Sequence, residues 1–291
     1  MRVGGGMRLG KAPTRLQEIE YRPARVTICV LVFIPEQFGY YQQRLEILKL
    51  CVASIVNHTP PETYDLLVFD NGSCGEVKDY LRSLHEEGVA RYLLLSRSNV
   101  GVANAHKIML HAAPGEIVAY SDDDVFFHPG WLEAHLEILE TFPRVGMVSG
   151  YCGEQRQSGG RDIVLEHNGI KAYSTAKHFQ FVAQRSVILQ GLDPEWDPKA
   201  IGRQMREMDK RIEALGYARL TTFQRYAQHM GNVLTPDFLD SLPATTSRES
   251  IKPWVEPKPF LMRLTRLPIA HSILSRLNTW SYNLLKAKPA E

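Results

Sequence analysis

The sequence predicts an α/β fold in which a mostly parallel sheet carries helices on both faces. Two observations predict it. Short apolar runs alternate with amphipathic stretches from residue 26 to residue 150. Polar side chains also gather where these runs end, and the carboxyl ends of strands are where open α/β sheets bind ligands. With 291 residues, 44% of them apolar, the chain can bury a large core.

The regular part of the predicted sheet spans residues 26–150 and begins with the β-branched run Val26 to Phe33. Residues 1–25, with six basic and two acidic side chains, are expected to form a basic extension before it. The expected strands are 26–33, 65–69, 91–95, 117–120 and 145–149, and the expected helices are 39–57, 76–84, 101–110 and 131–142.

The pattern becomes less regular over residues 151–250, which we interpret as a second half of the same domain. Expected strands there are 163–165, 179–183 and 217–221, and a charged helix is expected over 203–215. A stretch with several prolines then leads into a basic, helical C-terminal extension over 251–291.

The composition argues against nucleic-acid-binding, zinc-binding and membrane-spanning classes of protein. The net charge of +2 does not suggest a nucleic-acid partner, and the basic ends leave the central part acidic. Four cysteines without a C-x-x-C pair argue against a zinc site and favour a reducing compartment. No apolar run reaches the length of about 18 residues that spans a membrane. A cytoplasmic protein is expected, with contact to the inner membrane face left open.

Three adjacent acids, Asp122 to Asp124, follow the buried run at 117–120. Adjacent carboxylates repel one another and raise one another's pKa unless a cation or hydrogen-bond donors neutralise them. An Asp-x-Asp pair offers hard oxygen ligands to Mg²⁺ or Mn²⁺, which in turn hold a diphosphate. The alternative is a solvated acidic turn.

Polar residues also end two other strands. Asp70 and Asn71 follow the second strand, and Asn99 and Gly101 follow the third. Each group alone suits a turn or a helix N-cap. Together at one sheet edge they would line a cleft with acceptors, amide donors and carboxylates.

Several of these segments resemble the family-2 glycosyltransferases. They are the run at 26–33, Leu-Val-Phe-Asp-Asn-Gly-Ser at 67–73, Asn-x-Gly-x-Ala at 99–103, Ser-Asp-Asp-Asp at 121–124 and His-Pro-Gly-Trp-Leu at 128–132. The resemblance covers residues 26 to about 235. It implies a GT-A fold in which residues 26–150 form the nucleotide-sugar-binding half and residues 151–250 the acceptor-binding half. It also implies an inverting, metal-dependent transfer of sugar from a nucleotide-diphosphate donor to an acceptor hydroxyl on a glycan or lipid-linked glycan.

The resemblance also implies roles for the strand-end residues. Asp70, with Asn71, Asn99 and Gly101, would lie near the nucleoside. Asp122 would lie near the ribose, and Asp123 between it and Asp124. Asp124 would hold a divalent cation, Mn²⁺ or Mg²⁺, that bridges the diphosphate. His229 resembles a late histidine that ligates the metal in some relatives, although a structural histidine fits as well.

The family usually carries an acidic pair on a helix, one member of which acts as base on the acceptor hydroxyl. This chain has Arg206 to Arg211 at that place, with no adjacent Glu-Asp pair. Asp209 is the first candidate and Glu207 the second. Two residues apart on a helix, they face different ways. Both could instead be solvated charges paired with neighbouring basic residues.

That departure keeps a second function open, a non-catalytic relative that binds nucleotide sugars or glycans. A nucleotidyltransferase would need a Gly-rich phosphate loop after the first strand, where Phe33 to Gln37 lacks one. A Rossmann oxidoreductase would need G-x-G-x-x-G after a strand.

The C-terminal segment 258–288 holds leucines, isoleucines, Trp280 and Tyr282 among six basic residues, with no acid. A basic amphipathic helix of this kind can lie in an anionic membrane interface. It can equally pack on the domain or form a dimer contact.

Overall fold

A computed structural model describes residues 21–150, 163–174, 178–192, 201–235 and 238. The chain divides into two compact units, Met1–Val233 and Leu234–Glu291, and the sheet lies in the first. The predicted extension over 251–291 lies outside the described residues, as do residues 1–20.

The described strands are β1 (Val26–Val32), β2 (Tyr64–Asp70), β3 (Tyr92–Leu95), β4 (Ile117–Asp122), β5 (Val125–Phe127), β6 (Val145–Ser149), β7 (Ile163–His167), β8 (Ile170–Ser174), β9 (Gln180–Gln184), β10 (Ala218–Thr222) and β11 (Ala227–His229). The helices are α1 (Arg44–His58), α2 (Gly75–Glu86), α3 (Val102–Ala112), α4 (Trp131–Thr141), α5 (Arg185–Gly191) and α6 (Ile201–Ala214), with short 3₁₀ turns at Gly39–Tyr41 and Pro61–Thr63.

Nine strands form one sheet in the order β3-β2-β1-β4-β9-β6-β10-β8-β7. The block β3-β2-β1-β4 is parallel throughout, as alternating strands and helices predict. β9 then runs antiparallel between β4 and β6, and β8 runs antiparallel to β10. The mostly parallel α/β fold is therefore confirmed.

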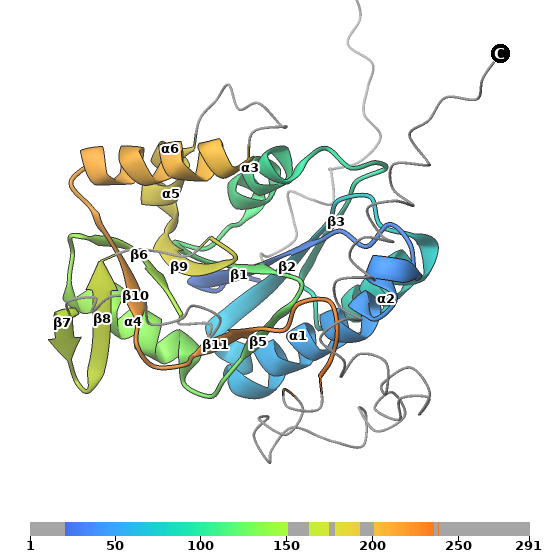
Figure 1. Ribbon diagram of the computed structural model, residues 1–291, viewed down its shortest axis with the longest axis horizontal. Helices are drawn as coiled ribbons and strands as arrows, with labels where there is room; N and C mark the ends of the chain where they lie inside the picture. Colours follow the sequence, from blue (N-terminus) through green and yellow to red (C-terminus); the bar gives the residue numbers. More distant parts are fainter. Residues whose placement is uncertain (1–20, 151–162, 175–177, 193–200, 236–237, 239–291) are drawn as a thin grey trace, which may run out of the picture. The chain divides into compact units, whose positions relative to one another are not determined.

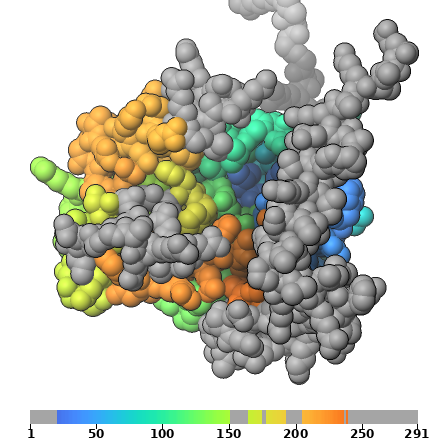
Figure 2. Space-filling model, viewed as in Figure 1, coloured from blue at the N-terminus to red at the C-terminus, as the bar shows by residue number. Residues whose placement is uncertain are grey.

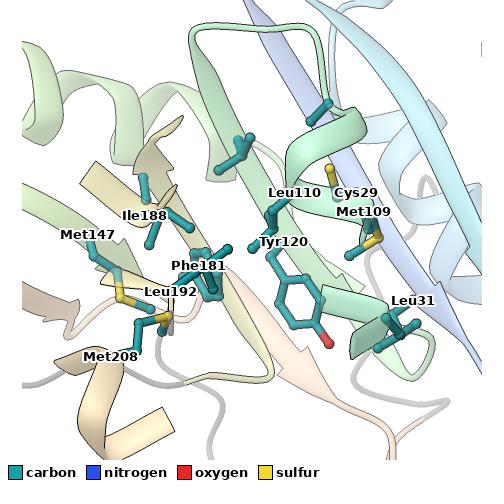
Figure 3. Close-up of a cluster of buried hydrophobic side chains, with 14 of the residues drawn as sticks. Cys29, Leu31, Met109, Leu110, Tyr120, Met147, Phe181, Ile188, Leu192 and Met208 are labelled. Atoms are coloured by element: carbon teal, nitrogen blue, oxygen red, sulfur yellow. The ribbon is translucent and has the colours of Figure 1, made fainter. Parts of the chain in front are cut away.

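Helices cover both faces of this sheet. In Figure 1, α3, α5 and α6 lie on one face and α1, α2 and α4 lie on the other. Figure 3 shows the core beneath the first group, where side chains of β1, β4 and β9 meet those of α3, α5 and α6. Tyr120 of β4 and Phe181 of β9 stack there, with ring centroids 5.2 Å apart. Burying this surface is the main favourable contribution to folding.

Two local expectations differ from the structure. The helix expected from Gly39 begins at Arg44 instead, because Gly39 has a φ of +57°, outside the right-handed helical range. β5, β8, β11 and α5 were not expected; the two shortest, β5 and β11, have three residues each, too few for a recognisable alternation.

β5 and β11 form a separate two-stranded antiparallel ribbon. Its register places His229 opposite Val125, the residue that follows the acid triplet. The late part of the first unit, orange in Figure 2, accordingly lies beside green atoms from the middle of the chain. This ribbon carries His229 to the carboxyl end of β4.

Candidate active site

A cleft opens at the carboxyl edge of the parallel block. The register pairs Val32 of β1 with Asp70 of β2, and Leu31 of β1 with Asp122 of β4, so both strand ends reach one edge. The cleft measures about 350 Å³. Its lining residues are Leu31, Phe33, Arg44, Asn71, Asn99, Gly101, Val102, Asp122, Asp123 and Asp124.

The first two acids of the triplet have raised pKa values. Burial raises the pKa of Asp122 to about 7, although the Tyr120 hydroxyl donates a hydrogen bond to its Oδ1 and so opposes the rise. Burial also raises the pKa of Asp123 to about 6, against the attraction of Arg44. Asp123 accepts hydrogen bonds from the Arg44 guanidinium and, at 3.3 Å, from the Phe33 N–H.

Asp124 differs from its two neighbours. Burial acts to raise its pKa, but hydrogen bonding to His229 and the charge of Arg44 outweigh burial and hold the pKa below its usual value. Its Oδ2 lies 2.5 Å from Arg44 Nη1 and 3.3 Å from His229 Nε2. Its Oδ1 is buried and has no hydrogen-bond partner among the described residues.

Arg44 is a site residue that the sequence reasoning missed. Its guanidinium contacts Asp123 and Asp124, and Nη1 also donates to the carbonyl oxygen of Gly231 at 3.2 Å and to Asn232 Oδ1 at 3.1 Å. One side chain from the first turn of α1 thus joins the triplet to the turn after β11. Three adjacent buried acids require a counter-charge, and that requirement was the signal that could have prompted a search for this arginine.

Asn71 and Asn99 organise the opposite wall. Asn71 Nδ2 donates to Asn99 Oδ1 at 3.0 Å, and Asn71 Oδ1 accepts the Val100 N–H at 2.9 Å. Asn99 Oδ1 also accepts the Gly101 N–H at 2.7 Å. These bonds fix the loop that leads into α3.

Asp70, which was expected to contact the nucleoside, lies behind this wall rather than in it. It is fully buried, and its carboxylate accepts the N–H groups of Gly72 at 3.3 Å and Ser73 at 2.9 Å. Lys78 Nζ lies 3.8 Å from its Oδ2. Asp70 shapes the turn, and its neighbour Asn71 faces the cleft.

The two base candidates on α6 are not among the residues that line the cleft. Asp209 is engaged through both oxygens, with His178 Nε2 at 2.9 Å from Oδ1 and Arg219 Nη1 at 2.9 Å from Oδ2. Glu207 pairs with Lys210 at 2.9 Å on a more exposed part of the helix. His178 did not enter the sequence reasoning, because no motif surrounds it.

Metal ligands are few in the part of the chain that the structure describes. No group of three or more His, Cys, Asp or Glu side chains is arranged there to hold an ion. Asp124 and His229 form a pair, and the buried Oδ1 of Asp124 is available. Mg²⁺ and similar cations commonly use one or two protein ligands and complete their shell with water and substrate phosphates. The pair fits that kind of site.

Comparison with known proteins confirms the resemblance seen in the motifs. Residues 40–178, just under half of the chain, match the family model described as glycosyl transferase family 2. The uncharacterized glycosyltransferase alr2836 of Nostoc sp. is 26% identical over 101 residues, which are 35% of this chain and 31% of that protein. The match thus spans less than a third of this relative's length.

Solved structures resemble the fold. S. aureus TarS, residues 1–349, aligns with a TM-score of 0.52 and 11% identity, covering 70% of this chain and 60% of that one. GalNAc-T7, solved with UDP, GalNAc and Mn²⁺, aligns with a TM-score of 0.57 and 14% identity, covering 72% of this chain and 44% of that one. At these identities the likeness concerns the fold, which is of the GT-A type.

Proposed function

We propose that this chain, which carries the family-2 glycosyltransferase match over residues 40–178, transfers a sugar from a nucleotide-diphosphate donor to an acceptor hydroxyl. The observation that carries the proposal is one cleft that unites the acid triplet with the Asn71–Asn99 wall. The transfer is proposed to be a single in-line displacement with inversion. A double displacement would need a nucleophilic carboxylate beneath the sugar, and none of the described acids is assigned that role.

The donor would lie along the cleft. The nucleoside is proposed to meet Asn71, Asn99 and Gly101, with Asp70 supporting the turn from behind. Asp122 is proposed to contact the ribose, and Asp123, held by Arg44, to fix the triplet's geometry. The apolar residues Leu31, Phe33 and Val102 also line the cleft, and an apolar wall suits the flat face of a nucleobase.

Asp124 and His229 are proposed to hold a divalent cation, Mn²⁺ or Mg²⁺. GalNAc-T7, with a similar fold, was solved with Mn²⁺. When bound, such an ion neutralises negative charge on a departing nucleoside diphosphate. Asp124 suits this role because its pKa is lowered, which keeps the carboxylate ionised.

The proton of the acceptor hydroxyl is proposed to leave toward α6, and Asp209 is proposed to assist its removal. Asp209 is mostly buried and ion-paired, whereas Glu207 is more exposed and paired to a neighbouring lysine. The acceptor is proposed to be a glycan or a lipid-linked glycan.

Membrane contact through residues 258–288 is also proposed. These residues lie outside the part of the chain that the structure describes. No described helix is long and apolar enough to span a bilayer. Flotation with anionic and neutral vesicles tests the proposal. Salt-sensitive binding to anionic vesicles that is lost on truncation after Pro257 supports it, and indifference to vesicles favours packing or dimer contact.

A non-catalytic binder of nucleotide sugars is the second candidate. The engagement of both Asp209 oxygens favours it, since a base needs an oxygen free to accept a proton. A stability panel with UDP-, GDP-, dTDP- and CMP-sugars, with and without Mn²⁺, tests both candidates. A donor at 100 times its Kd should add about 2.7 kcal/mol. Release of nucleoside diphosphate with an acceptor present indicates an enzyme, and protection of an intact donor indicates a binder.

A further inference from the structure

His178 and Asp209 form a histidine–carboxylate pair between the loop before β9 and helix α6. His178 Nε2 lies 2.9 Å from Asp209 Oδ1, and the two side chains are 26% and 15% exposed. On its other oxygen, Asp209 is held by Arg219 of β10 at 2.9 Å. The carboxylate is therefore fixed from two sides, and the imidazole is the more accessible member of the pair.

The backbone places His178 beside the cleft. The next residue, Phe179, accepts the Asp122 N–H through its carbonyl oxygen at 2.8 Å, and Asp122 lines the cleft. The Phe179 ring also lies 5.7 Å from the His229 ring. His178 thus directly precedes a residue that contacts both Asp122 and His229.

A carboxylate that accepts one imidazole N–H fixes the ring's tautomer and stabilises its protonated form. With Nε2–H donated to Asp209, the lone pair lies on Nδ1. An imidazole in this arrangement can take a proton that Asp209, held by His178 and Arg219, is poorly placed to take directly.

We propose that His178 is the general base of the transfer and that Asp209 is a positioning residue that acts through it. The inference rests on the proposed function. The acceptor O–H proton moves to His178 Nδ1 while the acceptor oxygen forms a bond to the anomeric carbon. The bond from that carbon to the phosphate oxygen breaks, and the nucleoside diphosphate leaves with the electron pair.

The groups that act on His178 favour this role. Asp209 of α6 accepts the imidazole N–H, and Arg219 of β10 holds Asp209 in place through its other oxygen. His106 of α3 interacts electrostatically with His178, but burial lowers the pKa of His106 to about 3, so it stays neutral. Asp209 is thus the charged group that contacts His178 directly.

The first test is His178→Gln, with His167→Gln as the matched control. His167 also lies 3.0 Å from a carboxylate, Glu137, but on the β7–β8 hairpin away from the cleft. We expect His178→Gln to lower kcat by 100-fold or more, with the donor KM within about twofold of wild type. His167→Gln should keep wild-type kcat. In His178→Ala, added imidazole should restore part of the rate.

The second test is the kinetics of Asp209→Asn. Loss of the carboxylate leaves the imidazole ring without the partner that fixes its tautomer and orientation, so kcat should fall at least tenfold while the donor KM stays within about twofold of wild type. A purely structural role for the pair would lower the fraction of active protein and leave kcat per active site unchanged. Wild-type kcat per active site in His178→Gln, or in Asp209→Asn, overturns the inference.

A different experimental result would overturn the proposed function. A wild-type chain that no nucleotide sugar stabilises, and that releases no nucleoside diphosphate, overturns both proposals. A wild-type chain that transfers sugar, together with a His178→Gln variant that binds donor and transfers equally fast, overturns only the assignment of His178.

Discussion

Arg44 Nη1 lies 2.5 Å from Asp124 Oδ2 in an ion pair whose side chains are 10% and 9% exposed. The pair joins the first turn of α1 to the end of β4, 80 residues further along the chain. The same guanidinium holds Asp123 and the turn after β11. Arg44 therefore provides the positive charge that allows two of the three acids to remain buried and ionised.

Replacing Arg44 with Met should destabilise the protein by about 3–5 kcal/mol, because removing one partner leaves buried carboxylates without a counter-charge. Urea unfolding at pH 7 measures the effect. The control is Arg82→Met, which breaks the Arg82–Asp79 pair on the surface, where the side chains are 50% and 74% exposed. That change should cost about 1 kcal/mol or less. Equal losses in the two variants would contradict the role given to Arg44.

Asp124→Asn should abolish sugar transfer and any stabilisation by Mn²⁺, since the amide removes the ionised ligand oxygen. The fold should persist, because Asn keeps the size of the side chain. Melting temperatures with and without Mn²⁺ measure the loss. Asp79→Asn, on the surface of α2, is the control and should respond to Mn²⁺ as wild type does. Wild-type turnover in Asp124→Asn would remove the metal assignment.

Gly72→Ala should destabilise the chain more than Gly88→Ala. Both glycines have positive φ, +90° and +77°, so both changes carry the backbone strain of about 1–2 kcal/mol. A Cβ at Gly72 would also lie 2.6 Å from the Ser98 carbonyl carbon and 2.7 Å from the Asn99 N, whereas nothing lies within 4 Å at Gly88. The Asn99 loop must then shift, so only Gly72→Ala should weaken donor binding. Urea unfolding and donor titration test the contrast.

His106→Phe should make stability less sensitive to acid. Burial lowers the pKa of His106 to about 3, so below about pH 6.5 the unfolded chain takes up a proton that the folded chain refuses. At pH 5 this costs about 2 kcal/mol relative to pH 7, and the variant should lack that loss. Asp122 and Asp123, with raised pKa values, act in the opposite direction in both proteins, so the difference between the two is the quantity to measure.

The control for this measurement is His111→Gln on the same helix, where the histidine is exposed. Its stability should change with pH as in wild type. Identical pH dependence in His106→Phe and wild type would contradict the assignment of the acid sensitivity to His106.

The parallel block could be predicted because its signals are local. The run that forms β1 and the acids that end β4 are each contained in a few consecutive residues, and helices between them require parallel pairing. The placement of β9 between β4 and β6 could not, because it depends on which long-range pairing buries most surface. A five-residue strand carries no information about its neighbours.

In the site, too, local features could be predicted from the sequence and long-range contacts could not. The acid triplet and Asn71 stand in recognisable turns, but Arg44 looks like an ordinary residue of an amphipathic helix until the fold brings it to Asp124. His178 and Asp209 are 31 residues apart in sequence and meet only through packing of α6 on the sheet. Chemistry that depends on pairs of distant residues is therefore the part that local patterns leave open.

The short β5–β11 ribbon has a consequence for how the molecule is made. Val125 emerges from the ribosome well before its partner His229, so the nascent chain carries the acid triplet without its imidazole. The turn that accepts the Arg44 hydrogen bonds is synthesised later still. The contacts of Asp124 with His229, and of Arg44 with Gly231 and Asn232, therefore form only when translation of the first unit is nearly complete. The acid triplet thus acquires its last partners late in the biogenesis of the chain.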